Sequence, residues 1–249
     1  SLLDCDRDNE RKEKRPVIKI ENLCKTYDGE TVLNDFSLTV PKGSVYGLMG
    51  LNGSGKTTVV RHLAGFLKAD SGTVTIDGQP VIDNEELKAR VLVIPDDIYF
   101  FRGYSLKDMK AYNKKIYKTW DDEIFQKMTD DFGIDVSKPM GKFSKGMKKQ
   151  AAFCLAMSTC PDYLILDEPV DGIDPVARRK LWHYIMGDVA ERQMTVLISS
   201  HNAREMGDVC DRIGIIAGGK MIFEDSLLDI YPVTVEEIFN EKLGGGEHA

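Results

Sequence analysis

The residues best suited to chemistry lie in a glycine-rich segment, GLNGSGKT, at residues 50–57. Glycines let successive backbone N–H groups curl around phosphate oxygens without interference from side chains. The Lys56 ammonium can reach the β and γ phosphate oxygens, and the Thr57 hydroxyl can bind Mg²⁺. The pattern predicts a nucleoside triphosphate site. The residues expected to contact the nucleotide are Gly50, Leu51, Asn52, Gly53, Ser54, Gly55, Lys56, Thr57 and Thr58.

A second pair of candidate residues, Asp167 and Glu168, closes an apolar segment, YLILDEP, at residues 163–169. The carboxyl ends of parallel strands meet at one edge of a sheet, where the glycine-rich segment also lies. We therefore expect Asp167 to hold a metal ion through its water shell, and Glu168 to orient or deprotonate an attacking water. The alternative is two surface acids at a strand end.

A histidine, His201, ends another apolar segment, TVLISSH. If that segment is a strand of the same sheet, the imidazole lies at the same edge and can contact the γ-phosphate. The alternative is a histidine whose hydrogen bonds are satisfied locally.

Four lysines crowd the segment GKFSKGMKKQ, residues 141–150, which allows two interpretations. One is a basic patch for phosphate backbones or an acidic membrane. The other is a helix that starts at Ser144 and Gly146, because the N–H groups of a helix start also bind phosphate. The whole chain is acidic, with 33 basic and 40 acidic residues and a net charge of −7, which disfavours a nucleic-acid partner.

The composition is that of an ordinary globular protein, 42% hydrophobic and 29% charged over 249 residues. No apolar run approaches the ~18–20 residues that span a bilayer, and we expect no signal peptide in the charged N-terminus. Five cysteines without a CxxC pair argue against a disulfide framework or a zinc site and favour a reducing cytoplasm.

The elements that must position these residues follow from the apolar pattern. Short apolar runs alternate with helical segments, which predicts an α/β fold with a parallel sheet and helices on both faces. An antiparallel β portion is expected at the N-terminal end. We divide the chain into a charged flexible tail (1–15), a main domain (16–230) with a helical insert (about 97–160), and a C-terminal extension (231–249).

Five motifs in this order resemble those of the ABC ATPases, the nucleotide-binding domains of ABC transporters. The resemblance covers roughly residues 16–230, and its motifs are GLNGSGKTT, FSKGMKKQ, YLILDEP, DGID and SSH. It implies a P-loop NTPase (RecA-like) core with an antiparallel β subdomain and an inserted α-helical subdomain. It also implies ATP and Mg²⁺ as ligands, bound in a head-to-tail dimer that encloses two ATP molecules.

The resemblance also implies roles for single residues. The Ser144 hydroxyl and the Gly146 N–H would bind the γ-phosphate of the ATP held by the partner subunit. Glu168 would be the general base, and His201 the switch histidine. Tyr27, in KTYDG, matches the aromatic residue that stacks on adenine.

The sequence departs from the family pattern at two places. Asp96 stands where the family's Q-loop has glutamine; a carboxylate remains an oxygen ligand for Mg²⁺ but adds negative charge near the triphosphate. The signature motif has Lys145 in place of a glycine and Met147 in place of a glutamine. Lys145 either adds positive charge near the phosphate or points to solvent.

With these two departures, the sequence resembles a group of single-domain bacterial ATPases. Those ATPases pair with separate ABC-2-type permeases, mostly for export. The resemblance therefore implies an ATPase subunit that works as a homodimer or as a heterodimer with another ABC ATPase. Its permease would hold it at the cytoplasmic face of the membrane as a peripheral protein. Phe100, Phe101 and Tyr104 would contact the permease if exposed, with core packing as the alternative. A soluble ABC ATPase of translation or DNA repair is the second hypothesis, disfavoured by the single cassette. A P-loop kinase or GTPase would leave residues 143–150 unexplained.

Overall fold

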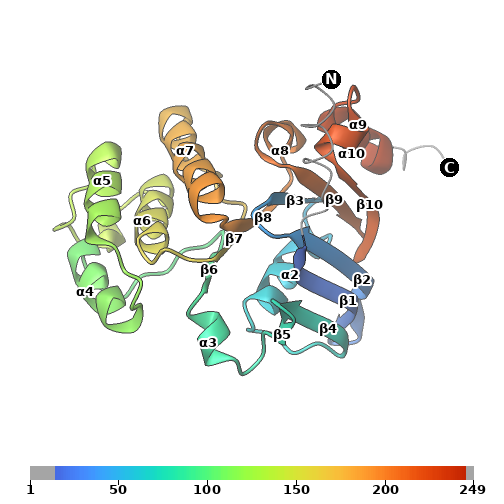
Figure 1. Ribbon diagram of the computed structural model, residues 1–249, viewed down its shortest axis with the longest axis horizontal. Helices are drawn as coiled ribbons and strands as arrows, with labels where there is room; N and C mark the ends of the chain where they lie inside the picture. The colour runs from blue at the N-terminus through green and yellow to red at the C-terminus, as the bar shows by residue number, and fades with distance from the viewer. Residues whose placement is uncertain (1–14, 245–249) are drawn as a thin grey trace, which may run out of the picture.

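The computed structural model describes residues 15–244 (Figure 1). The predicted charged tail therefore lies outside the described residues except for Arg15, as does the end of the predicted C-terminal extension. Within the described residues, no helix combines the length and the apolar character that crossing a membrane requires.

Two sheets form the centre of the molecule. The smaller sheet is antiparallel, as predicted for the N-terminal part, and its order is β2 (Glu30–Pro41), β1 (Pro16–Tyr27), β4 (Ser71–Ile76) and β5 (Gln79–Pro80). In the larger sheet all neighbours are parallel except the first pair. Its order is β10 (Lys220–Ser226), β9 (Arg212–Ala217), β3 (Val45–Met49), β8 (Thr195–Ser200), β7 (Tyr163–Asp167) and β6 (Val91–Ile94).

The larger sheet is covered on both faces, and the side chains of β7 show how. Tyr163 and Ile165 face a core shared with the antiparallel sheet and with α2 (Lys56–Leu63). Leu164 and Leu166 face the other core, which is filled by helices on the opposite side. Alternate residues of a strand point to opposite faces, so a strand buried on both faces is a continuous apolar run. The prediction of a sheet between two layers is confirmed.

The remaining helices surround these sheets (Figure 1). They are α3 (Glu85–Lys88), α4 (Leu106–Ile116), α5 (Asp122–Phe132), the 3-10 turn Met140–Lys142, α6 (Lys145–Met157), α7 (Pro175–Arg192), α8 (Ala203–Val209), α9 (Leu227–Ile230) and α10 (Val235–Gly244). The helices α4, α5 and α6 form a group at the left of Figure 1, on the opposite side of the molecule from β1 and β2.

Local signals set several helix ends. The Asp174 side chain accepts hydrogen bonds from two N–H groups of the first turn of α7, and Pro175 occupies the first helical position. The helix after the glycine-rich segment ends at Leu63, since Gly65 adopts a left-handed φ of 68°. The predicted domain boundaries stay predictions, although Val235 and Ile238 of α10 are buried in the helical core.

The buried imidazole of His62, on α2, predicts a pH dependence of stability. Burial lowers the pKa of His62 below its ordinary value of 6.5, outweighing the opposing effect of the Thr58 carbonyl 2.8 Å from Nδ1. As the pH falls, the unfolded chain therefore binds a proton at His62 at a higher pH than the folded chain does. This contribution to stability is present above pH 6.5 and is lost as the pH falls below it. His62→Leu should reduce the fall in thermal midpoint between pH 7 and pH 5 by ~3 °C. An identical fall in both proteins would contradict the prediction.

Candidate functional site

One edge of the larger sheet collects three segments that lie far apart in the sequence. Asp167 pairs with Ser199, and Met49 pairs with Ser200, so β7, β3 and β8 end at the same level. The glycine-rich loop follows β3, Glu168 follows β7, and His201 follows β8. The edge predicted from the sequence is therefore present.

The glycine-rich loop has the backbone shape that its glycines allow. Gly53 and Gly55 adopt left-handed φ values of 79° and 112°. A Cβ atom on Gly50 would lie 2.5 Å from the Ile216 carbonyl oxygen, so only glycine fits there. Of the predicted contact residues, the exposed ones are Leu51, Asn52, Gly53 and Thr57, and the buried ones are Gly50, Ser54, Gly55, Lys56 and Thr58.

The Lys56 ammonium lies inside this loop. It donates to the carbonyl oxygens of Gly50, at 2.8 Å, and Leu51, at 3.2 Å. It also lies 3.5 Å from Glu168 Oε1. The buried Ser54 hydroxyl has no hydrogen-bond partner among the described residues. A cation and a free hydroxyl therefore stand beside the N-terminus of α2, which suits an anion.

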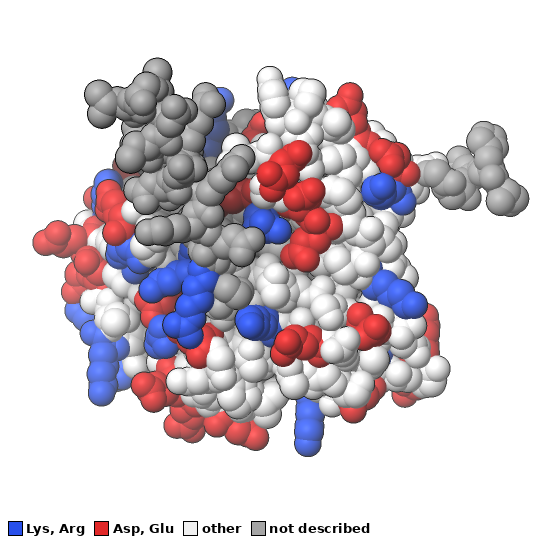
Figure 2. Space-filling view, turned by 45° about the vertical axis from the view of Figure 1, so that its right-hand side comes forward, with Lys and Arg blue, Asp and Glu red and all other residues white. Residues whose placement is uncertain are grey.

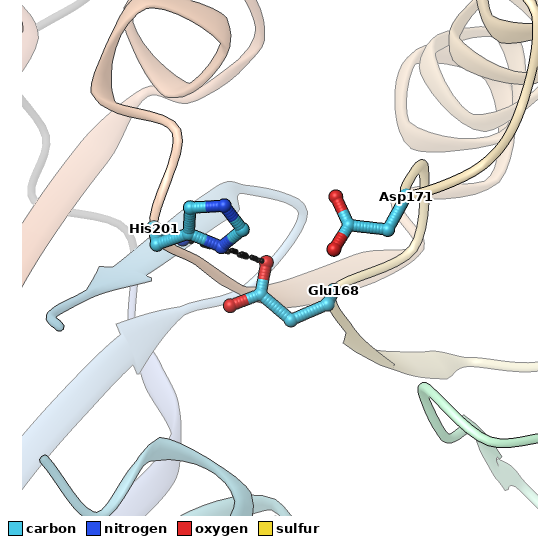
Figure 3. A group of neighbouring side chains, drawn as sticks. All are labelled: Glu168, Asp171 and His201. Atoms are coloured by element: carbon cyan, nitrogen blue, oxygen red, sulfur yellow. Dashed lines mark hydrogen bonds and ion pairs between the residues drawn. The ribbon is translucent and has the colours of Figure 1, made fainter. Parts of the chain in front are cut away.

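Glu168 contacts both Lys56, in the loop, and His201, and Figure 3 shows the contact with His201. Its Oε2 lies 3.0 Å from His201 Nδ1, and the Asp171 carboxylate points toward the same pair. Ligand atoms of Glu168, Asp171 and His201 all lie within 4.8 Å of one another. Sequence reasoning named DGID as a motif but did not single out Asp171, whose position depends on the bend of the loop after β7.

Asp167 is buried, at 3% exposed. Its Oδ1 accepts a hydrogen bond from the Ser199 hydroxyl. The carboxylate of Asp167 and the exposed hydroxyl of Thr57 are hard oxygen donors of the type that Mg²⁺ prefers. The donor set at this edge thus fits the predicted ion.

Asp96, two residues after β6, contacts the lysine-rich segment. Its Oδ1 lies 2.9 Å from Lys149 Nζ and 3.1 Å from Lys145 Nζ. Burial raises the pKa of Asp96, but the hydrogen bonds from both lysines outweigh it and hold the pKa below its ordinary value. The sequence analysis offered Lys145 a phosphate or solvent; the structure instead pairs its half-exposed side chain with Asp96.

The lysine-rich segment does start a helix, as the second interpretation predicted. Ser144 is the N-cap of α6, and its hydroxyl accepts a hydrogen bond from the Met147 N–H. A Cβ atom on Gly146 would lie 2.4 Å from the Gly172 carbonyl oxygen, so glycine is required. Within residues 15–244, no hydrogen bond or ion pair joins Ser144 to the glycine-rich loop.

Tyr27 lies at the end of β1, in the antiparallel sheet. Its ring is half-buried, and Lys25 Nζ lies 5.4 Å from the ring centroid. Its contact with adenine stays a prediction.

A phosphate-binding loop between a parallel strand and a helix, with a carboxylate pair at the neighbouring strand end, defines a P-loop NTPase. The model of the ABC transporter family matches residues 33–171, and the chain belongs to this family as an ATP-binding, ATP-hydrolysing subunit. It is 35% identical over 200 residues to the ABC transporter ATP-binding protein YtrB of Bacillus subtilis, spanning 80% of this chain and 68% of the relative.

Other relatives and solved structures agree. The bacitracin transport ATP-binding protein BcrA of Bacillus licheniformis is 32% identical, over 84% of this chain and 69% of the relative. The lantibiotic transport ATP-binding protein SrtF of Streptococcus pyogenes is 32% identical, over 91% of this chain and 97% of the relative. The solved ATP-binding subunit of an ABC transporter superposes with a TM-score of 0.82 at 24% identity, covering 90% of this chain and 98% of that chain, which shows the fold.

Proposed function

We propose that two copies of this ATPase, or one copy and a related subunit, enclose two ATP molecules and drive a separate membrane permease, most simply for export. The names of the relatives, which include bacitracin and lantibiotic transport and Nod factor export, support this proposal. They give no support to a role in translation or DNA repair. The chain would lie on the cytoplasmic face of the membrane, held there by the permease.

The observation that carries the proposal is the contact of Glu168 with both Lys56 and His201 at the sheet edge. Lys56 would turn from the loop carbonyls to the β and γ phosphate oxygens when ATP enters. Glu168 would accept a proton from the attacking water, and His201 would contact the γ-phosphate. Tyr27 would stack on adenine.

Thr57 and Asp167 would hold Mg²⁺, which offsets the negative charge of the phosphates. The prediction that Asp96 also holds the metal stays open, and one of its oxygens already accepts from two ammonium groups. Ser144 and Gly146 would bind the ATP of the partner subunit.

A nucleic-acid partner is no part of this proposal. On the face shown in Figure 2, the described Lys and Arg side chains lie among Asp and Glu side chains and form no continuous basic surface. Such a mixed surface lacks the field that attracts a phosphate backbone.

The permease would dock on aromatic side chains near the start of α4. Phe101 is 55% exposed and Tyr104 is 41% exposed, with ring centroids 5.2 Å apart. The Phe101 ring also meets that of Tyr112, at 5.8 Å. Phe100, expected with them, packs instead against the helical core. The exposed aromatic group is therefore Phe101, Tyr104 and Tyr112, a kind of surface that is typical of protein contacts.

Phe101→Ala combined with Tyr104→Ala should move the chain from the membrane fraction to the supernatant in cells that produce it with its permease. Truncating two anchor residues of an interface commonly costs at least ~10-fold in affinity. Lys115→Ala, at an exposed position of α4, is the control and should keep wild-type sedimentation. Unchanged membrane association of the double variant would exclude these side chains from the contact.

A further inference from the structure

Lys149, in α6, is a buried cation in a helix whose other buried residues are apolar except Gln150. Its side chain is 1% exposed, although lysine is among the residues least often buried. A buried ammonium is stable only when its charge is paired and its N–H groups are bonded. Lys149 Nζ meets this requirement with two partners, the Asp96 carboxylate at 2.9 Å and the Glu168 backbone carbonyl oxygen at 2.5 Å.

The second partner matters because Glu168 has an unusual backbone. Its φ is 45°, a left-handed value that a residue other than glycine adopts only when its surroundings enforce it. Its N–H donates to the Ser199 carbonyl oxygen at 3.0 Å, and its carbonyl accepts from Lys149. The two bonds therefore hold the residue from both sides.

This conformation directs the Glu168 side chain. With the backbone held in place, the carboxylate lies between Lys56 Nζ, 3.5 Å from Oε1, and His201 Nδ1, 3.0 Å from Oε2. A rotation of the backbone by a few tens of degrees would move both oxygens away from these groups. The position of the carboxylate thus depends on a bond made on the other side of the chain.

Lys145 is a useful contrast, because it shares only one of the two partners. Its ammonium also pairs with Asp96 Oδ1, at 3.1 Å, but its side chain is 54% exposed and makes no bond to Glu168. Asp96 would therefore keep a cation if Lys149 lost its charge. Among the hydrogen bonds and ion pairs of residues 15–244, those of Lys149 alone join both Asp96 and Glu168 to α6.

We propose that Lys149 is a positioning residue for the reaction. Its ammonium, held in place by Asp96, bonds the Glu168 carbonyl and keeps the Glu168 carboxylate aimed at the nucleotide site. The inference rests on the proposed role of Glu168 as general base. It also gives the Asp96 that replaces the family's glutamine a function of its own, the compensation of a buried charge.

The test is Lys149→Met, which keeps the length and the apolar stem but removes the ammonium. In ATP hydrolysis by the purified chain, kcat should fall at least ~10-fold, because a general base displaced by ~1 Å loses much of its effect. The KM for ATP should stay within about twofold, since the glycine-rich loop is untouched. The thermal midpoint should change by no more than ~3 °C, because Asp96 is partly exposed and keeps Lys145 as its cation, so that no buried charge is left unpaired.

Lys148→Met is the matched control, since it makes the same chemical change one residue earlier. The Lys148 side chain is half-buried and has no hydrogen bond or ion pair among the described residues. This variant should keep wild-type kcat and KM. A comparable loss of kcat in Lys148→Met would overturn the inference, because any methionine in this turn would then lower kcat, whether or not it removes the bond to Glu168.

The other outcomes are distinct. A wild-type kcat in Lys149→Met overturns the inference alone, provided that Glu168→Gln is inactive. Wild-type turnover in Glu168→Gln removes the general base itself, and the inference with it. If kcat and the thermal midpoint fall together by large amounts, Lys149 is a structural residue only, and the inference is overturned.

If Lys149→Met does not fold, Asp96→Asn is the deciding variant. It should lower kcat about threefold or more, and an unchanged kcat overturns the inference.

Discussion

Glu168→Gln should lower kcat for ATP hydrolysis by at least ~100-fold and leave ATP binding intact. The amide has the shape of the carboxylate, so it can stay beside His201 in the same pocket. It cannot accept a proton from water, and this step is the one assigned to Glu168. The variant should therefore accumulate the proposed ATP-bound dimer, because it cannot hydrolyse the bound ATP. Phosphate release measures the first effect, and light scattering during gel filtration with Mg-ATP measures the second.

Asp171→Asn is the control for this experiment. It also removes one negative charge from the group in Figure 3, but from a residue that no proton transfer requires. Its kcat should fall less than ~10-fold. Equal losses in both variants would mean that total charge, and not the identity of the base, governs the rate. Wild-type turnover in Glu168→Gln would remove Glu168 from its role.

The parts of the site that lie in one segment could be predicted from the sequence. The loop at residues 50–57 is set by local composition, because its glycines permit a backbone that other residues cannot adopt. Asp167, Glu168 and His201 could be placed because each ends an apolar strand, and parallel strands end at a common edge. The start of α7 is also set locally, by the Asp174 cap and by Pro175 at the first helical position.

Contacts between distant polar residues could not be predicted. Lys149 and Asp96 are 53 positions apart, and neither belongs to an apolar repeat that would indicate its neighbours. A lysine-rich segment indicates solvent by composition, yet tertiary packing buries one of its lysines and leaves another half-exposed. Phe100 and Phe101 present the same difficulty, since adjacent aromatic residues gave no signal of which one faces the core.

Ser144→Arg should abolish ATP-dependent dimerisation while a single subunit still binds ATP with an affinity within about twofold of wild type. Ser144 is exposed at the start of α6, so a larger side chain meets no buried neighbour within the subunit. Across the proposed interface it would replace a small hydroxyl, a donor to the γ-phosphate, with a bulky guanidinium that cannot fit the same space. Steady-state hydrolysis should fall at least ~100-fold, because the proposed dimer would complete the site.

The loss of the helix cap must be separated from the loss of the interface. Arginine cannot accept the hydrogen bond from the Met147 N–H, which costs about 1 kcal/mol. Ser144→Gly tests this separately, since glycine is a tolerated N-cap and adds no bulk; it should weaken the dimer without abolishing it. Both changes are best made in the Glu168→Gln background, where the wild-type interface gives a stable dimer. A dimer that persists there with Ser144→Arg, under Mg-ATP, would place the signature motif away from the partner's nucleotide.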